Sequence, residues 1–271
     1  MNTVEKWLTK PRLSLIYILL GLFAISCDAE EFSLQIKGVA VVDPTTCLPG
    51  SSSNGQLMTQ GAIDLIIAQD YQVTLALQNL LVDPRSITGL SEKEGGVNTS
   101  DVTLTEVKIS YLDPDEVGIG IEEDLTVPLG GVLKTGEVNP SFHPVKVLTR
   151  QMVEILLQNG IFRGVNESGR LGPTRGSFHL VLSLQVKGET LDGKNVESNS
   201  LSFPVEVCLG CRVRSGINSE LNSTECQQIT EAENTLSEIC PEVIGRDLNF
   251  TSCALCRDFA VDEPLAALCI P

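Results

Sequence analysis

Cysteines are the residues of this chain whose number and spacing could carry chemistry. There are nine, and seven of them fall within residues 208–269, where two C-x2-C pairs enclose two single cysteines. Thiols at such spacing bind zinc, exchange disulfides or close structural disulfides. The nine are Cys27, Cys47, Cys208, Cys211, Cys226, Cys240, Cys253, Cys256 and Cys269.

Structural disulfides explain these cysteines better than zinc or redox chemistry. The two C-x2-C pairs are separated by 41 residues, beyond the roughly 15–20 usual in a zinc ribbon, and no histidine follows His179. A thioredoxin-like role would place its C-x2-C on a βαβ unit, which the pattern does not contain. We therefore predict that the eight cysteines after Cys27 are oxidised and that the chain holds no metal and no cofactor. Zinc binding and redox-active thiols are the alternatives.

A capping box at Thr224 predicts a helix running to about Ile239. Cys226 and Cys240 would then lie roughly 21 Å apart along one face, too far for a disulfide. We expect their partners among the flanking C-x2-C pairs or Cys269, with Cys47 available to join the body of the chain to this module.

Other candidate sites are weaker. "DPDEVGIGIEED" places Asp113, Asp115, Gly118 and Asp124 at spacing that resembles a calcium loop. Val117 occupies a ligand position there, and no helices flank it, which favours a solvated acidic turn. The chain lacks G-x-S-x-G, H-E-x-x-H and a phosphate-binding glycine loop, and neither His143 nor His179 neighbours an obvious nucleophile. We predict that the protein is not an enzyme.

Cys27 lies where an apolar segment meets an acidic one. Lys6, Lys10 and Arg12 precede fourteen uncharged residues, 13–26, which is short for a membrane span and typical of a signal peptide. Ordinary cleavage after Ser26 is one interpretation. Ala24-Ile25-Ser26-Cys27 also resembles a bacterial lipobox, in which the cysteine receives diacylglycerol. Lipidation of Cys27 leaves eight cysteines to pair, so we favour it.

A lipidated Cys27 predicts an exported protein anchored in the bacterial cell envelope. Asp28 follows the cysteine, as in lipoproteins retained at the periplasmic face of the inner membrane, so that membrane is slightly favoured over the outer one. A secreted eukaryotic glycoprotein is the main alternative, and four N-x-S/T sequons would then matter: Asn98, Asn166, Asn222 and Asn249.

Charge narrows the choice of partners. The net charge is −16, and removal of residues 1–26 leaves 16 Lys and Arg against 34 Asp and Glu, a net charge of −18. Such acidity argues against nucleic acid and against peripheral binding to anionic lipid through basic patches. It leaves a membrane held through the lipid anchor, and an envelope protein, as the expected partners.

The elements that would position these residues are mainly β-strands. "FHLVLSLQV" and "YQVTLALQN" alternate apolar and polar residues. In "DVTLTEVKISY" the apolar parity changes, which predicts a β-bulge near Thr105-Glu106. Asp192-Gly193 predicts a two-residue hairpin turn with both central φ angles positive, and Pro204 predicts that the return strand lies at a sheet edge.

One helix interrupts the strands, with Thr149 as N-cap, an apolar stripe after it and Gly160 at its end. These patterns predict a mainly β chain, with an antiparallel β-sandwich body and a small, partly helical, disulfide-rich C-terminal module. We divide the chain into a signal peptide (1–26), a lipid-anchored tether (27–31), a β-sandwich domain (32–207) and a cysteine-rich module (208–271).

Short motifs in this chain resemble a group of uncharacterised predicted cell-envelope lipoproteins of the myxobacterial type. That group combines a lipobox with a G-x-I/L-D strand, a tyrosine-led strand ending in Asn-Leu, and a late C-x-G-C. The matching residues here are Gly61, Ile63, Asp64, Tyr71, Asn79, Leu80, Cys208, Gly210 and Cys211. The resemblance implies an envelope lipoprotein and brings no activity with it. We therefore expect a lipid-anchored structural or interaction protein without catalytic activity; an extracytoplasmic module that binds a small ligand or metal is the alternative.

Overall fold

The computed structural model divides into two compact units, Met1–Glu31 and Phe32–Pro271. All residues that the structure describes belong to the second unit. Cys27, the predicted signal peptide and most of the cysteine-rich module therefore lie outside the described residues. The structure describes residues 32–43, 46–49, 56–82, 99–116, 118–121, 124–158, 160–165, 171–173, 176–211, 213–214, 246–247, 251–252, 260, 265 and 269.

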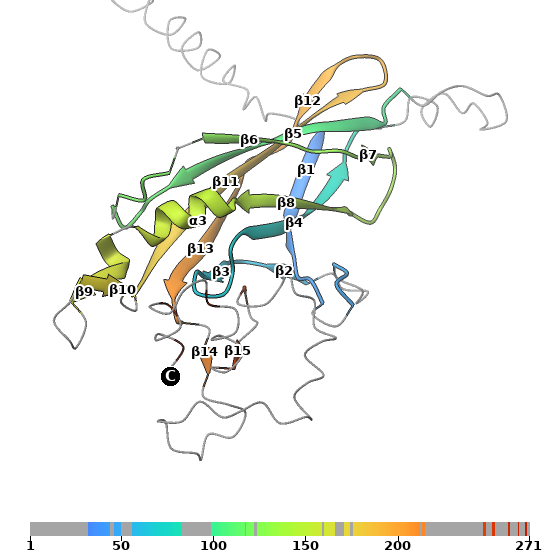
Figure 1. Cartoon of the computed structure of the whole chain (residues 1–271). Coiled ribbons are helices and arrows are strands. Elements are labelled where there is room, and N and C mark those ends of the chain that lie inside the picture. The colour runs from blue at the N-terminus through green and yellow to red at the C-terminus, as the bar shows by residue number, and fades with distance from the viewer. Residues whose placement is uncertain are drawn as a thin grey trace, which may run out of the picture. The chain divides into compact units, whose positions relative to one another are not determined.

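The first sheet has four antiparallel strands in the order β2-β1-β4-β8 (Figure 1). The central strands β1 and β4 pair from Leu34 opposite Asn79 to Ala40 opposite Thr74. The strand bounds are Leu57–Met58 for β2, Leu34–Ala40 for β1, Tyr71–Asn79 for β4 and Ser141–Leu148 for β8.

The second sheet has the order β3-β13-β11-β5-β6, with β12 paired to β11 and β7 paired to β5. Its pairs are antiparallel except β13 with β3, which is parallel, so this sheet is mixed. The bounds are Gly61–Asp64 (β3), Leu201–Leu209 (β13), Gly176–Thr190 (β11), Val102–Leu112 (β5), Asp124–Pro128 (β6), Asn195–Glu197 (β12) and Val132–Leu133 (β7).

Smaller elements complete the described chain. Two further two-stranded sheets pair β10 (Leu171–Pro173) with β9 (Arg163–Val165) and β14 (Val213–Arg214) with β15 (Thr251–Ser252). A 3-10 turn, η2, spans Gly160–Phe162. None of the helices in the described residues is both long and apolar enough to cross a membrane.

Side chains from both main sheets form one hydrophobic core, which confirms the mainly β sandwich. Alternation produces it: on β11 every second residue is buried, because successive side chains of a strand point to opposite faces. The buried apolar side chains on β11 are Phe178, Leu180, Leu182, Leu184 and Val186; those on β4 include Val73, Leu75 and Leu77; those on β13 include Phe203, Val205 and Val207.

The predicted bulge in β5 is confirmed. Glu106 pairs with Lys187 and Leu104 with Gly188, so Thr105 has no counterpart on β11. This extra residue moves Val107 and the odd-numbered apolar residues after it onto the buried face that Val102 and Leu104 also use. Apolar parity in the sequence was therefore sufficient to locate the irregularity, because a one-residue insertion exchanges the two faces of a strand.

The hairpin at Asp192-Gly193 exists, but the predicted turn type was wrong. Three residues, Leu191 to Gly193, connect Thr190 to Lys194, and the Gly193 N–H donates to Thr190 O at 2.9 Å. Only Gly193 has a positive φ there, at 83°. The Thr190 side chain explains the difference, because its hydroxyl bonds to Asp192 and accepts from the Lys194 N–H at 3.0 Å, which fixes the longer loop.

The strand that contains Pro204 is not the edge strand that we predicted. β13 lies between β11 and β3. The pairing with β3 starts at Val205 opposite Gly61, one residue after the proline. Pro204, which cannot donate to a ladder, is thus outside the short stretch that β3 covers. β13 also continues to Leu209, past the predicted end of the body at residue 207.

The predicted helix is confirmed as α3, Arg150–Leu157. The Thr149 hydroxyl accepts from the Met152 N–H at 3.3 Å, as an N-cap does. Met152, Val153 and Leu156 are buried against the core. Gly160 begins η2 two residues beyond the C-cap, Gln158.

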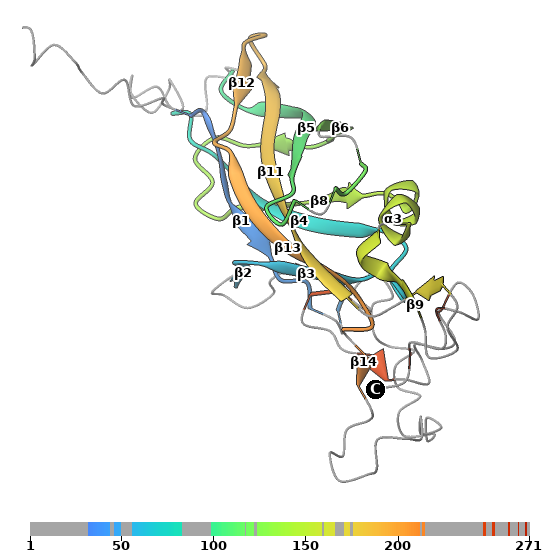
Figure 2. The same cartoon turned by 90° about the vertical axis from the view of Figure 1, so that its left-hand side faces the viewer.

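Strand β11 runs from one end of the sandwich to the other (Figure 2). At one end Gly176 pairs with Leu209, beside Asp64 and Cys208. At the other end Thr190 pairs with Val102, close to the place where β1 starts opposite Asn79. We call these the Asp64 end and the Asn79 end. β4 also runs between them, from Tyr71 to Asn79.

Candidate functional site

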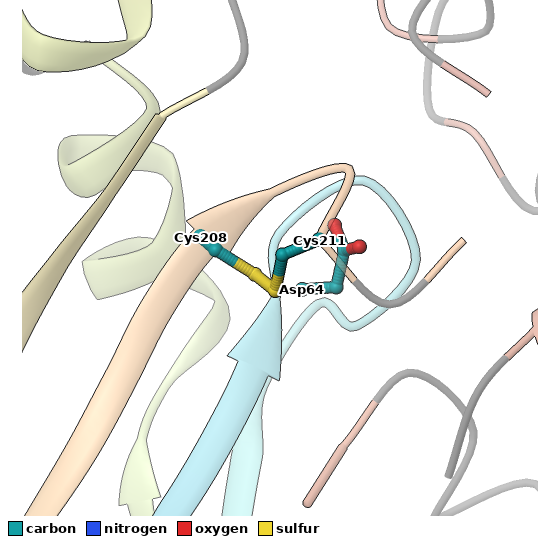
Figure 3. Close-up of side chains that lie close together, drawn as sticks. All are labelled: Asp64, Cys208 and Cys211. Carbon is teal, nitrogen blue, oxygen red and sulfur yellow. A yellow bond between two sulfur atoms is a disulfide. The ribbon is translucent and has the colours of Figure 1, made fainter. Parts of the chain in front are cut away.

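Asp64, Cys208 and Cys211 form a cluster at the Asp64 end (Figure 3). A carboxylate oxygen of Asp64 and the two sulfur atoms all lie within 4.8 Å of one another, and among the described residues this is the group with the chemistry to hold a metal ion. Asp64 and Cys208 are fully buried, whereas Cys211 is exposed. Cys208 and Cys211 are joined by a disulfide, with their Cα atoms 5.9 Å apart.

Asp64 terminates β3 and organises the turn after it. Its Oδ1 accepts from the Ile66 N–H at 3.1 Å, which is an Asx turn, and its main-chain oxygen accepts from Ala68 at 2.9 Å. Oδ1 also accepts from the Gly210 N–H at 3.0 Å, so one buried carboxylate holds two chain segments together. Main-chain donors of this kind stabilise a buried carboxylate.

The turn that carries the disulfide depends on Gly210. This residue has φ of 79°, a left-handed conformation that glycine adopts without the strain of a side chain. It lies between Cys208, the penultimate residue of β13, and Cys211, and its N–H contacts Asp64. Leu65 extends the connection by donating to Cys208 O at 2.9 Å. The C-x-G-C sequence therefore folds back onto the end of β3.

Gly61 and Tyr71 form a second contact at the same end. The Tyr71 hydroxyl donates to Asp247 Oδ1 at 2.5 Å, and the Ala62 N–H donates to the same oxygen at 3.2 Å. A Cβ on Gly61 would overlap the Tyr71 hydroxyl and would lie 2.9 Å from the Phe203 ring. Glycine at position 61 thus lets the buried tyrosine reach its carboxylate partner.

An ion-pair network lies beside this contact. Arg246 pairs with Asp70, and Lys146 pairs with the other oxygen of Asp70 at 2.6 Å. The Arg246 side chain is 11% exposed, so this cation depends on its carboxylate partner far more than a surface arginine would. Arg246 and Asp247 form a bridge and a backbone bond to Ile63 and Ala62, respectively, and fix a distant part of the chain to β3.

Asn79 is the buried polar residue that organises the opposite end. Its amide nitrogen donates to Ser100 O at 2.8 Å and to Leu133 O at 3.1 Å, and its Oδ1 accepts from the Leu81 N–H at 2.9 Å. One side chain thus joins the segments that follow β4, precede β5 and include β7. These are main-chain contacts, which shape loops without providing a reactive group.

The residues of the predicted calcium-like loop do not converge. Asp113 accepts from the Gly118 N–H at 2.8 Å, while Asp115 accepts from the His179 N–H at 2.7 Å. This main-chain bond, assisted by the His179 ring, lowers the pKa of Asp115. Asp124 bonds instead to Ser110 at 2.6 Å. Within the described residues these carboxylates are not among the groups that could hold a metal ion.

The two histidines lie apart from each other and from the Asp64 cluster. His179, on β11, contacts Asp115, with 3.3 Å between Nδ1 and the carboxylate. His143, on β8 opposite Leu75, is partly buried, and that burial lowers the pKa of its ring. Its Nε2 is buried without a hydrogen-bond partner among the described residues.

The remaining cysteines divide into two groups. Cys47 and Cys269 are each part of a disulfide. Cys226, Cys240, Cys253 and Cys256 lie outside the described residues, as does Cys27. Because Cys208 and Cys211 pair with each other, neither serves as a partner for Cys226 or Cys240, which removes one set of partners that we expected for those two.

Three residues that stabilise the Asp64 end were not predicted from the sequence. Asp70, Arg246 and Asp247 were not singled out, although they bind Tyr71 and Lys146 and stabilise the Asp64 end. Asp247 and Tyr71 are 176 residues apart in the chain, and an acidic chain contains many aspartates. The sequence offers no local signal that selects these two.

Comparison with known proteins adds little. No family model matches the chain, and no curated protein matches it. Among solved structures, it is similar to the solution structure of a protein described as late embryogenesis abundant (LEA), with a TM-score of 0.35 and 11% sequence identity. The likeness covers 73% of this chain and 85% of that one.

Proposed function

We propose that this protein is a cell-envelope lipoprotein, held in a bacterial membrane by diacylglycerol on Cys27, with a structural or interaction role and no catalytic activity. The observation that carries the proposal is the sequence Ala24-Ile25-Ser26-Cys27 at the end of a fourteen-residue apolar run, just before the sandwich begins. Lipid chains on one cysteine provide stable anchoring, since each buried CH₂ contributes about 0.8 kcal/mol.

The geometry of the Asp64 end supports a structural role. Each polar residue of the resemblance motif in the described chain has a main-chain or side-chain partner that closes a turn or joins strands. Asp64 accepts two N–H groups, Tyr71 bonds to Asp247, and Asn79 holds three loop segments. Side chains engaged in this way specify a fold, whereas catalysis requires groups aimed at a substrate.

Lipid labelling tests the anchor. Cells that express the full chain and are fed labelled palmitate should incorporate label into the wild-type protein and into Ser26→Ala, which keeps a small residue before the cysteine. Cys27→Ala should take up no label and should move from the membrane fraction to the soluble fraction. Equal labelling of wild type and Cys27→Ala would refute lipidation at this residue.

Asp28 slightly favours an anchor at the periplasmic face of the inner membrane over one in the outer membrane. On this proposal, the wild-type protein fractionates with inner membranes and Asp28→Ser moves to the outer membrane. Wild type in the outer membrane, with no change in Asp28→Ser, would contradict the assignment while leaving lipidation intact.

An interaction role predicts a stable neighbour in the envelope. Cross-linking in native membranes, followed by purification of the wild-type protein, should recover a defined envelope protein. The soluble Cys27→Ala variant should lose that protein, because it is no longer held at the same surface. Recovery of the protein alone, at every cross-linker length, would argue against an interaction role.

A metal-binding module is the second candidate, and the Asp64 cluster is the observation that favours it. If the disulfide were reduced, two thiolates and a carboxylate would be available within the range that a Zn²⁺ ion requires. A ligand that binds only the folded form, at a free concentration of about 100 times its Kd, stabilises a protein by about 2.7 kcal/mol. Zn²⁺ should then raise the melting temperature of the reduced protein, and Cys211→Ser should abolish the rise. An unchanged melting temperature would exclude this candidate.

A further inference from the structure

Large apolar side chains are exposed mainly at the Asn79 end. Val138 is 86% exposed and Leu191 is 54% exposed. Two of the other exposed ones, Leu48 and Leu57, lie in and after the β1–β2 connection, and Leu112 lies at the far end of β5. Six of the nine that the described residues contain are at the Asn79 end: Phe32, Leu80, Val82, Val132, Val138 and Leu191.

Hydrogen bonds connect the segments that carry four of these residues: Phe32, Leu80, Val82 and Leu191. Leu80 donates to Ser33 O at 2.9 Å, which brings it beside Phe32. The Ser100 hydroxyl donates to Val82 O at 3.2 Å, and the next residue, Asp101, accepts from the Leu191 N–H at 3.2 Å.

The same end includes the loop between β7 and β8. Val132 pairs with Thr103 on β5, and the Gln78 side chain donates to the carbonyl of Glu137, next to Val138, at 3.2 Å. The β4–β5, β7–β8 and β11–β12 connections and the start of β1 therefore meet at one end of the sandwich.

The short segment between Cys27 and Phe32 limits how far the Asn79 end can lie from a membrane that holds Cys27. Phe32 is five residues after Cys27, a reach of about 18 Å for a fully extended chain. β11, with fifteen residues, spans roughly 48 Å from one end of the sandwich to the other. If Cys27 carries lipid, the tether is too short to let the sandwich turn its Asn79 end away from the bilayer.

We propose that the Asn79 end is a membrane-docking surface, which rests its six exposed apolar side chains on the phospholipid surface that holds the acylated Cys27. The inference depends on the proposed lipid anchor. It extends that anchor by fixing the orientation of the sandwich, with the Asp64 end directed away from the membrane.

The charges at this end are compatible with such a surface. Asp192 pairs with Lys194 at 3.0 Å, and Asp101 accepts the Thr135 N–H at 2.9 Å. These contacts offset part of the repulsion that acidic groups meet at an anionic leaflet. The exposed apolar residues would add a second membrane contact to the lipid anchor.

Tryptophan fluorescence can test the orientation with little background. The one tryptophan of the chain, Trp7, lies in the predicted signal peptide, so the processed protein contains none. Leu191→Trp places a probe at the Asn79 end, and Leu112→Trp is the matched control, since Leu112 is 55% exposed and lies at the opposite end of β5. Val82→Trp supplies a second probe at the Asn79 end.

The purified lipidated variants are incorporated into phosphatidylcholine vesicles with brominated acyl chains, and binding is confirmed by flotation. Emission of Leu191→Trp and Val82→Trp should shift to shorter wavelength and be quenched by the bromolipid, while Leu112→Trp stays unquenched. Proteins that float with all three probes unquenched, or with Leu112→Trp quenched equally, would overturn the docking surface and leave the anchor in place. Failure of every variant to float would overturn the anchor itself.

Discussion

The two ends of the sandwich use buried polar residues for different purposes. At the Asp64 end, the Asp64 carboxylate joins β3 to the disulfide-closed turn that follows β13, and Arg246 pairs with Ile63 of β3 and with Asp70. At the Asn79 end, the neutral side chains of Asn79 and Thr190 hold loops that expose apolar side chains. β4 carries one member of each set, Tyr71 and Asn79, at its two ends.

This difference assigns a different role to each end: the Asp64 end stabilises a short strand, and the Asn79 end presents loops. Charged and covalent contacts at the Asp64 end keep a β3 of only four residues in place, since a strand so short has few ladder bonds of its own. The strands at the Asn79 end do not depend on such contacts, because the long strands β5 and β11 stay paired up to Thr190 opposite Val102. Its loops are instead available to contact a surface.

The largest effect on stability is expected from Gly61→Ala. The added methyl group would overlap the Tyr71 hydroxyl, which cannot withdraw without losing Asp247, and would crowd Phe203 at 2.9 Å. Overpacking of this kind costs about 3 kcal/mol. Chemical denaturation should show the loss, and hydrogen exchange should rise mainly at the Asp64 end.

Gly130→Ala is the matched control, because a Cβ there meets no atom within 4 Å. It should change the free energy of unfolding by no more than about 0.5 kcal/mol. If Gly61→Ala were as stable as Gly130→Ala, the close contact between Gly61 and Tyr71 would not exist in the protein.

The next effect is expected from Asn79→Ala, which tests the other end. Removal of the amide leaves the Ser100 and Leu133 carbonyls and the Leu81 N–H without this partner. We expect a loss of about 2–3 kcal/mol, with faster exchange in the loops around Leu81 and Ser100. Asn79→Asp keeps the acceptor and lacks the donor, so it should recover little of that loss. If Asn79→Ala instead raised hydrogen exchange at Gly210, the stabilities of the two ends would not be independent.

A smaller loss of folding stability is expected when the disulfide at the Asp64 end is removed. Cys208–Cys211 closes a loop of four residues, and a loop of that size contributes about 2 kcal/mol in the chain-entropy account. Cys211→Ser removes the bond at the exposed sulfur and leaves Cys208 buried. Calorimetry should show the lowered stability, and non-reducing peptide mapping of the wild type should recover the Cys208–Cys211 link. A link from either cysteine to another would contradict the clustered geometry.

The smallest effect is a pH dependence at His143. Burial lowers the pKa of this ring below its ordinary value of 6.5. The unfolded chain therefore takes up a proton at higher pH than the folded chain does. The contribution of neutral, buried His143 to stability is fully present above about pH 6.5. It is lost as the pH falls toward the pKa that His143 has in the folded chain.

The melting temperature of the wild type should fall between about pH 7 and about pH 5, and His143→Gln should show a smaller fall. The lowered pKa values of Asp115 and Asp192 act below about pH 4 and do not overlap this window. Identical pH profiles for the wild type and the variant would show that burial of His143 has no such effect.

Patterns that act along one strand were readable from the sequence. Alternation located β4 and β11, and a change of parity located the bulge at Thr105. The N-cap at Thr149 was equally local. These features depend on neighbours two to four residues away, so the sequence contains all the information that they require.

Features that depend on distant residues were not readable. Pro204 indicated an edge, but β3 arrives from residues 61–64 and pairs just beyond it. Asp192-Gly193 indicated a two-residue turn, but Thr190 fixes a longer one. Asp64 was identified only by resemblance to a motif, and its contact with Gly210 bridges 146 residues.

The most direct test of the proposed lipid anchor is the mass of the first peptide of the mature protein. Protein purified from membranes is digested, and its N-terminal peptide is identified by mass spectrometry. The proposal predicts a chain that begins at Cys27 and carries a diacylglycerol group on its sulfur. A mature chain that begins at Cys27 without lipid, or that retains residues 1–26, would contradict it.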